Sequence, residues 1–324
     1  MLAFRRLCAA VVSAALACTA IHAQAQVFPS KAIKIVVPFG AGGVADLTAR
    51  TVAQKLSEAV GQAVVVENKP GAGGVGAGDA VAKADPDGHT LLLISNGTAV
   101  TAGLFKSLPY DTLKDFAPVS ILGTFDIAII ASADSRFKTL GDLVSFAKSN
   151  PGKLNLGSVN IGSTQNLAAE LLKSSAGLDV QVVPFNGTPA LVTALRGGQI
   201  DAAVEILGPV MGQIKGGALR ALAVTGERRA SALPDVPTAK ESGLANYVAA
   251  SWNGLAAPAK TPKDVIARLN RELVAILNQP DTRAKLLAIN VDARASTPEQ
   301  AADLLASDIK RWGDVITRAN IPKQ

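Results

Sequence analysis

Cysteine, histidine and aromatic residues are scarce in this chain of 324 residues. The two cysteines, Cys8 and Cys18, lie near the N-terminus, and the two histidines are His22 and His89. Zinc sites, cysteine nucleophiles and most serine–histidine arrangements need more of these residues than the sequence offers. Aromatic residues make up 4% of the chain, which argues against stacking surfaces for nucleic acid. We therefore expect no metal site, no cofactor and no nucleic-acid partner.

Residues 1–25 have the pattern of a secretory signal peptide. Two arginines precede an apolar run from Leu7 to Ala20, and Ala23-Gln24-Ala25 fits a cleavage site after a small residue. The run is shorter than the roughly 20 apolar residues of a membrane-spanning helix, so we expect export to the periplasm without embedding in the membrane. A lipoprotein is the alternative, because Ala15-Leu16-Ala17-Cys18 loosely resembles a lipobox.

The rest of the chain, from Gln26 onward, carries a modest positive charge and no cysteine. The 32 Lys and Arg residues exceed the 26 Asp and Glu residues by six, and removal of the two leader arginines lowers the net charge to +4. These charges form no basic block, which fits a mild preference for anions. About 300 residues are enough for two domains of ordinary size.

A strand, a glycine-rich turn and a helix are expected over residues 33–60. The turn contains Gly40, Gly42 and Gly43, and Asp46 lies in the first turn of the helix. A helix start reached through glycines exposes backbone N–H groups at the positive end of the helix dipole, which predicts an anion site. The turn lacks the Lys and the Ser/Thr of a nucleotide P-loop, so a small carboxylate is the favoured anion.

A second glycine-rich stretch, expected as a loop over 68–78, contains the spacing of a dinucleotide fingerprint at Gly71, Gly73 and Gly76. We reject that interpretation because Asn68-Lys69-Pro70 separates the glycines from the preceding strand and no acidic residue follows at the spacing that would hold a ribose. A tight turn followed by a helix over 79–84 is the favoured structure.

The next buried strand is expected from His89 to Ser95. The polar stretch Asn96-Gly97-Thr98 would form a loop at its carboxyl edge, where open α/β sheets bind ligands. His89, at the other end of this strand, is interpreted as a residue that flanks a turn.

A second strand–loop–helix unit is expected over 154–176, with the helix beginning at Asn166. Gly162, Ser163, Thr164 and Gln165 would stand at its N-terminus. Two such units facing each other could hold one anion from both sides. An ordinary capped helix is the alternative, because Ser and Thr are favoured N-cap residues.

Two β runs, Val119 to Ala131 and Asn246 to Ala257, are long enough to cross between two domains; the first is expected to be interrupted at 124–126. The other expected strands are 62–67, 180–185, 200–206 and 219–225, and the other expected helices are 139–150, 190–196, 262–277 and 298–319.

Several ordered motifs together resemble the Bug family, the extracytoplasmic solute receptors of tripartite tricarboxylate transporters. They are Phe28-Pro29-Ser30-Lys31, Val37-Pro38-Phe39 with Gly42-Gly43 and Asp46, Glu67-Asn68-Lys69-Pro70-Gly71-Ala72-Gly73-Gly74, Asp85-Pro86-Asp87-Gly88, Ala221-Leu222-Ala223-Val224-Thr225, Leu233-Pro234-Asp235-Val236-Pro237-Thr238 and Leu255-Ala256-Ala257-Pro258. The resemblance implies a bilobal α/β periplasmic binding protein of type II, with two doubly wound lobes joined by two β crossings. We expect lobe I to comprise 26–126 and 252–324, and lobe II to comprise 127–251.

The same resemblance implies that two strand-to-helix loops, one in each lobe, pinch a ligand carboxylate. Matched by motif, these loops are 38–46 and 157–166, the two turns already identified from the residues. This chain has Asn166 where many relatives have His, and His89 where they often have Tyr. The expected ligand-binding residues are Phe39, Gly40, Ala41, Gly42, Gly43, Asp46, Asn96, Thr98, Gly162, Ser163, Thr164, Gln165 and Glu205.

The expected function is reversible capture of a small organic acid by a monomer that delivers it to a membrane permease. One alternative is a periplasmic lyase or hydrolase, although Asp46, Asp126 and Glu205 are the only acids expected at the cleft and no base or metal accompanies them. Another is a receptor that presents its ligand to a sensor.

Glu205 is expected near the carboxyl end of a strand, at the edge where the cleft should lie. An acid beside a bound carboxylate is unfavourable by on the order of a few kcal/mol. Either the ligand also carries a cation, or the acid is protonated, or Glu205 points away and pairs with a surface base.

Overall fold

The computed structural model describes residues 28–230, 232–318 and 320–324, so the expected signal peptide lies outside the described residues. The strands are β1 (Ile33–Val37), β2 (Val64–Asn68), β3 (Thr90–Ser95), β4 (Phe116–Ser132), β5 (Asn155–Val159), β6 (Gln181–Phe185), β7 (Ala202–Ile206), β8 (Leu219–Val224), β9 (Ala250–Pro258) and β10 (Val291–Ala293). The helices are α2 (Val44–Val60), α3 (Val75–Ala82), α4 (Asn96–Leu104), α5 (Leu140–Ser149), α6 (Thr164–Ser175), α7 (Thr188–Arg196), α8 (Leu207–Lys215), α9 (Lys263–Leu277), α10 (Pro280–Ala288) and α11 (Pro298–Arg318), with a 3-10 turn η1 (Ala72–Gly74).

The first sheet has the order β2-β1-β3-β9-β4, with β10 also paired to β4. Strands β1, β2 and β3 are parallel, as their connections through helices require, whereas β9 runs antiparallel to both β3 and β4. Helix α2 packs against β1 and β2, and α9 and α11 pack against β4. The carboxyl end of β3 leads directly into α4, and that of β1 leads through the turn at 38–43 into α2.

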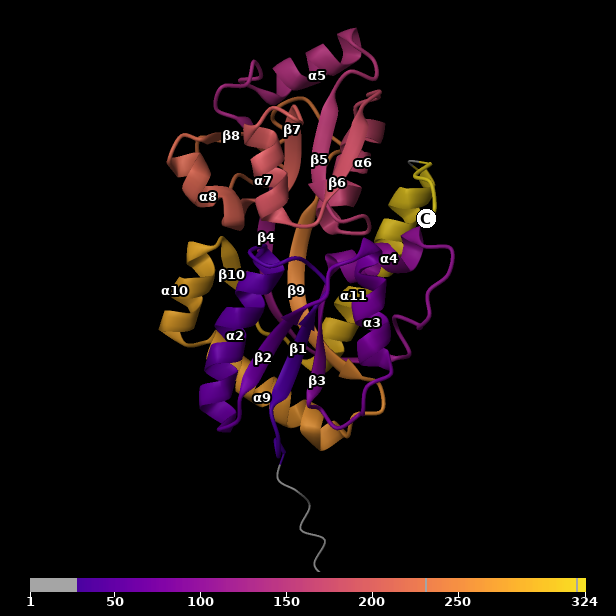
Figure 1. Ribbon diagram of the computed structural model, residues 1–324, viewed down its shortest axis with the longest axis vertical. Coiled ribbons are helices and arrows are strands. Elements are labelled where there is room, and N and C mark those ends of the chain that lie inside the picture. Colours follow the sequence, from indigo (N-terminus) through magenta and orange to yellow (C-terminus); the bar gives the residue numbers. More distant parts are fainter. Residues whose placement is uncertain (1–27, 231, 319) are drawn as a thin grey trace, which may run out of the picture. The chain divides into compact units, whose positions relative to one another are not determined.

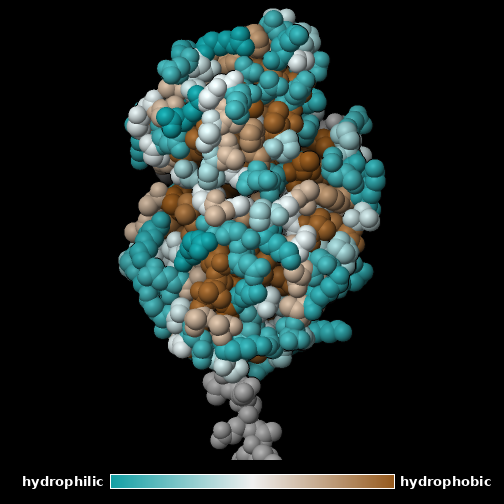
Figure 2. Space-filling model, in the orientation of Figure 1, coloured by the Kyte–Doolittle hydropathy of each residue, from teal (hydrophilic) through white to brown (hydrophobic). Residues whose placement is uncertain are grey.

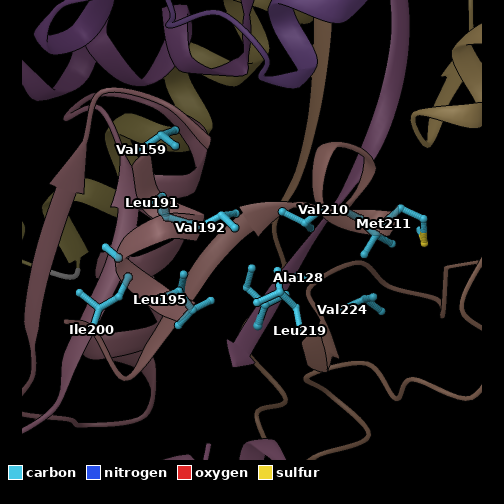
Figure 3. Close-up of a cluster of buried hydrophobic side chains, with 14 of the residues drawn as sticks. Ala128, Val159, Leu191, Val192, Leu195, Ile200, Val210, Met211, Leu219 and Val224 are labelled. Atoms are coloured by element: carbon cyan, nitrogen blue, oxygen red, sulfur yellow. The ribbon is translucent and has the colours of Figure 1, made fainter. Parts of the chain in front are cut away.

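The second sheet has the order β4-β7-β5-β6, and β8 also pairs with β4. Strand β5 is parallel to both of its neighbours, β6 and β7. Strand β4 runs antiparallel to β7 and β8. Figure 3 shows the hydrophobic core on this sheet, where side chains of α7 and α8 meet those of the strands. The core includes Leu191, Leu195, Val210 and Ala128.

Strand β4 belongs to both sheets. It pairs with β9 as far as Asp126 and with β7 from Ile127 onward. Figure 1 shows β4 and β9 running between the elements around β1 to β3 and those around β5 to β8. Residues 31–324 form one compact unit, and the expected lobe boundaries stay a prediction. On the face shown in Figure 2, hydrophobic residues gather in patches separated by hydrophilic ones.

Several local expectations were wrong. Asn96-Gly97-Thr98 is not a loop but the first turn of α4, because Ser95 and Thr98 form a capping box that starts the helix at once. The expected interruption of β4 at 124–126 is absent, since β9 and β10 hydrogen-bond the strand from both sides there.

The helix expected from residue 79 begins at Val75 and includes Gly76 and Gly78. A Cβ on Gly78 would lie 2.5 Å from the Tyr110 ring, so this glycine allows the helix to pack. The elements α8, α10 and β10 had no counterpart in the sequence-based expectation.

Candidate functional site

A pocket with about 430 Å³ of space not occupied by protein atoms lies between residues of the first sheet and residues of the second. The lining residues are Phe39, Gly40, Gly43, Val44, Ala45, Ser95, Phe125, Val159, Asn160, Thr164, Gln165, Gly187, Thr188, Ile206, Ser251 and Asn253.

Five helices begin at this pocket. The lining includes an N-cap residue or first-turn residue of each of α2, α4, α6, α7 and α8, namely Gly43, Ser95, Thr164, Gly187 and Ile206. Each helix start carries partial positive charge and N–H groups without an intrahelical partner. No side chain caps the starts of α2, α7 and α8, so these amide groups are left for another acceptor.

The residues that line the pocket include no acidic or basic side chain. The lining therefore offers an anion the dipoles of helix starts and no Lys or Arg side chain. The side-chain amide Nδ2 of Asn253 is buried at the pocket and has no hydrogen-bond partner among the described residues. A buried donor without a partner is unfavourable, and an anionic acceptor in the pocket would satisfy it.

The turn between β1 and α2 is braced from behind by Asp46. The Gly42 amide donates to Asp46 Oδ2 at 3.0 Å, and Arg50 Nε donates to Oδ1 at 2.9 Å. Asn68 extends this bracing, since its Nδ2 donates to the Phe39 carbonyl at 3.1 Å. Burial raises the pKa of the Asp46 carboxyl, but the hydrogen bonds from Arg50 and Gly42 outweigh burial and the pKa lies below its usual range. Asp46 holds the turn and does not line the pocket.

The opposite wall is the start of α6. Ser163 is the N-cap, accepts from the Asn166 amide at 3.0 Å, and donates to the Val159 carbonyl at 2.7 Å. These two hydrogen bonds hold the Ser163 hydroxyl between the end of β5 and the start of α6. Thr164 and Gln165, the next two residues, line the pocket instead.

The two walls touch each other outside the pocket. The Gly73 amide donates to the Ile161 carbonyl, and Thr101 Oγ1 lies 2.9 Å from the Gly73 carbonyl and 3.4 Å from that of Gly162. A Cβ on Gly162 would lie 2.6 Å from Gly73 Cα. The backbones therefore approach too closely at this point for any side chain.

A buried polar network joins the α6 start to the first sheet. Thr164 Oγ1 donates to Asn96 Oδ1 at 3.2 Å and lies 3.1 Å from Ser251 Oγ. Asn96 Nδ2 donates in turn to Asp308 at 2.6 Å, and Trp252 Nε1 donates to the same carboxylate oxygen at 2.7 Å. Asn96 thus fixes Thr164 in place from outside the pocket lining.

Glu205 lies at the end of β7 with no exposed surface. Its Oε1 accepts from Gln165 Nε2 at 3.0 Å and from the Ile206 amide at 2.7 Å. Burial raises the pKa of this carboxyl, although the hydrogen bonds from Gln165 and Ile206, and the nearby Thr188 side chain, act in the opposite direction. No salt bridge found within the described residues includes Glu205, so the expected alternative of a surface base is wrong.

Five of the expected site residues line the pocket: Phe39, Gly40, Gly43, Thr164 and Gln165. The others lie around it, and they are Ala41, Gly42, Asp46, Asn96, Thr98, Gly162, Ser163 and Glu205. Thr98 serves as the acceptor for the Ser95 amide in the capping box, at 3.0 Å.

Some lining residues were not expected from the sequence. Gly187 and Thr188 carried a usable signal, because Asn186-Gly187-Thr188-Pro189 is a helix start that follows a strand, as in the two turns that were selected. Ser95 carried a similar signal as a possible N-cap. Phe125, Ser251 and Asn253 lie inside strands and carried none.

Residues 48–321 match the model of the family described as the tripartite tricarboxylate transporter family receptor. The chain belongs to this family. It is similar to Protein BugT of Bordetella pertussis, with 34% identity over 295 residues that cover 90% of each chain. The resemblance to Bug proteins is therefore confirmed, and the chain is a periplasmic binding protein of a family of solute receptors, not enzymes.

Two solved structures carry the same fold. One is an R. palustris protein with adipate, at 30% identity and a TM-score of 0.87, covering 91% of this chain and 99% of that one. The other is MatC from Rhodopseudomonas palustris with bound malate, at 34% identity and a TM-score of 0.83, covering 89% of this chain and all of that one. The expected fold class, an α/β periplasmic binding protein, is confirmed.

Two negative findings apply to the described part of the chain. No helix there combines the length and the apolar character needed to span a membrane. Within the same residues, no group of three or more His, Cys, Asp or Glu side chains is placed to hold a metal ion.

Proposed function

We propose that this receptor captures a small organic carboxylate in the pocket between β1–α2 and β5–α6 and delivers it to a tripartite tricarboxylate-type permease. The observation that carries the proposal is the meeting of five helix starts around a pocket that no charged side chain lines. A carboxylate would accept hydrogen bonds from these amide groups and benefit from the helix dipoles.

The remaining lining supports an organic acid rather than an inorganic anion. Phe39, Val44, Phe125, Val159 and Ile206 provide apolar surface for a hydrocarbon portion. Polar side chains, among them Asn160, Thr188 and Asn253, provide hydrogen bonds that would orient the ligand. Related proteins have been solved with malate and with adipate, which supports a carboxylate as the shared ligand chemistry.

We also propose the remaining sequence-based expectations for the intact protein. The chain is exported, its mature form begins near Gln26, and it acts as a monomer with lobes bounded near 126 and 252. Mass spectrometry of the exported protein measures the new N-terminus. A lipid on Cys18 or an intact Met1 would contradict this proposal.

Calorimetric titration with malate, adipate and adipamide tests the ligand proposal. Adipamide has the length of adipate but no charge, so we expect an acid to bind and adipamide not to bind. Since a ligand that binds only the folded state raises the melting temperature, a thermal shift gives an independent readout. Failure of every acid in a wider panel would overturn the proposal, and conversion of a bound acid to product would favour an enzyme.

A further inference from the structure

Glu205 is a buried acid beside the pocket, and no salt bridge within the described residues includes it. Two residues of the pocket lining, Gln165 and Thr188, lie next to its carboxyl. Its Oε2 is buried and has no hydrogen-bond partner of normal geometry in the described chain, although Thr188 lies next to the carboxyl. A second negative charge entering the pocket would therefore be poorly compensated if Glu205 stayed ionised.

The charged residues on the elements around Glu205 do not supply that compensation. Strand β7 packs against β4, β5, α6, α7 and α8. Ala128 of β4 pairs with Glu205, and β5 has no charged residue. The charged residues on the other packed elements are Asp126 on β4, Glu170 and Lys173 on α6, Arg196 on α7 and Lys215 on α8.

These residues either bond to other groups or lie along their helices away from the pocket end. Asp126 accepts from Asn290 Nδ2 at 3.3 Å. Arg196 and Lys215 are the last residues of α7 and α8, at the ends opposite the pocket. Glu170 and Lys173 follow Gln165 by more than one helical turn. No cation in this set forms an ion pair with Glu205.

Gln165 connects the protonation of Glu205 to the pocket. With Glu205 ionised, Gln165 Nε2 donates to Glu205 Oε1 at 3.0 Å, and the other arm of the same side-chain amide is the acceptor oxygen of a residue that lines the pocket. A carbonyl oxygen attracts a donor and repels a carboxylate. If Glu205 carried a proton, its O–H could donate to that carbonyl, and the rotated amide would turn its N–H groups to the pocket.

We propose that Glu205 is a proton-binding site linked to the pocket: a carboxylate binds together with one proton on Glu205, and Gln165 then presents an N–H donor to the bound anion. This inference rests on the proposed function, since it requires a carboxylate ligand. The proton comes from solvent and adds to the carboxylate, and no other covalent bond changes. Glu205 is a positioning residue that acts through Gln165.

Proton uptake on binding means that ligand affinity should fall as pH rises. A bound anion favours the protonated form of Glu205, so ligand binding raises the pKa of this group further. Affinity is then constant below the pKa of the free protein, falls by up to about tenfold per pH unit between the free and bound values, and is constant again above the bound value.

Calorimetric titration with adipate and with malate, in steps from about pH 6 to about pH 10, measures this effect. We expect wild-type affinity to fall at least about fivefold over the range, and proton uptake to appear as a dependence of the binding heat on the buffer. Glu205→Gln mimics the protonated acid and should bind with little pH dependence. Glu170→Gln, which changes a half-buried acid on α6 that does not line the pocket, should retain the wild-type dependence.

Carbon-13 NMR of side-chain carboxyls in glutamate-labelled wild-type protein gives a second readout that needs no variant. The Glu205 resonance should titrate at higher pH after adipate or malate is added. If an acid shifts the Thr164 and Gln165 amide resonances but leaves the Glu205 titration unchanged, this inference fails and the proposed function stands. If no acid binds, both fail. If the zwitterion aspartate binds wild type but not Glu205→Gln, Glu205 acts in its charged form and the inference is overturned.

Discussion

Two glycine-rich turns in the first sheet region have similar sequences but different surroundings. The turn at Gly40–Gly43 borders the pocket, whereas the turn at Gly71–Gly74 lies against the backbone at 161–162 and does not border it. Both bring backbone close to the opposite wall, because a Cβ on Gly40 would lie 2.3 Å from the Asn186 carbonyl oxygen. Glycine spacing therefore marks close approach of two backbones, and it does not reveal whether a ligand lies between them.

The turns also differ in how they are held. Gly73 adopts a positive φ of 62°, and its carbonyl accepts from Thr101, while Gly40 has an ordinary φ and its turn is braced by Asp46. A side chain at Gly73 should therefore disturb the turn itself. A side chain at Gly40 should disturb only the meeting of the two walls.

The largest expected effect is on binding, from Gly40→Ala. The added methyl group would overlap the Asn186 carbonyl oxygen and keep the walls apart. We expect adipate or malate affinity to fall on the order of 100-fold, about 2.7 kcal/mol, by calorimetry. Denaturant unfolding of the free variant should stay close to wild type. A folded variant with wild-type affinity would remove the contact at Gly40 from the binding mechanism.

Gly73→Ala should act mainly on stability. It forces Ala into the left-handed region and places a Cβ 2.6 Å from the Phe105 ring, which we expect to cost about 1–2 kcal/mol of unfolding free energy. Urea unfolding measures this cost. Binding should weaken less than in Gly40→Ala because the added Cβ meets Phe105 and Thr101, which belong to the same wall as Gly73, and not the opposite wall. The reverse order of the two binding losses would contradict the distinction between the turns.

Asp46→Ala should loosen the pocket turn by removing its bracing. We expect the free energy of unfolding to fall by about 1 kcal/mol, because the Gly42 amide loses its acceptor. The ion pair with half-exposed Arg50 contributes little. The pKa of Asp46 is lowered in the folded protein, so its contribution is present above the unfolded-state pKa and is lost as pH falls through the folded value. Unfolding at neutral and acidic pH should show the difference between wild type and variant shrinking in acid.

Gly76→Ala gives the smallest expected effect and serves as a control for both turns. Gly76 lies inside α3, and a Cβ added to it would meet only Lys69 Cε, at 4.0 Å. We expect the free energy of unfolding to rise by up to about 0.5 kcal/mol, because Ala has a higher helix propensity than Gly. Ligand affinity should not change. Loss of binding would mean that the third glycine of the rejected dinucleotide spacing has a role in the site.

Part of the pocket lining could be located from the sequence, but the role of several side chains could not. The two strand–turn–helix units were recognised, and Gly43, Thr164 and Gln165 line the pocket as expected. Asn96 was also selected, yet its partner Asp308 is 212 residues away along the chain. No local pattern indicates such a pairing, so the position of Asn96 outside the pocket lining could not be foreseen.

The sequence by itself determined the local units and the family, because apolar runs, glycine turns and helix starts are properties of short windows of residues. Only the tertiary structure decided which helix starts meet at one pocket and which charges are left without a partner. The pairing of β7 with β4 places the buried Glu205 beside Gln165, and no salt bridge within the described residues includes it. Strand register and packing between distant segments control such placement, and a shift of one residue would reverse the direction of the side chain.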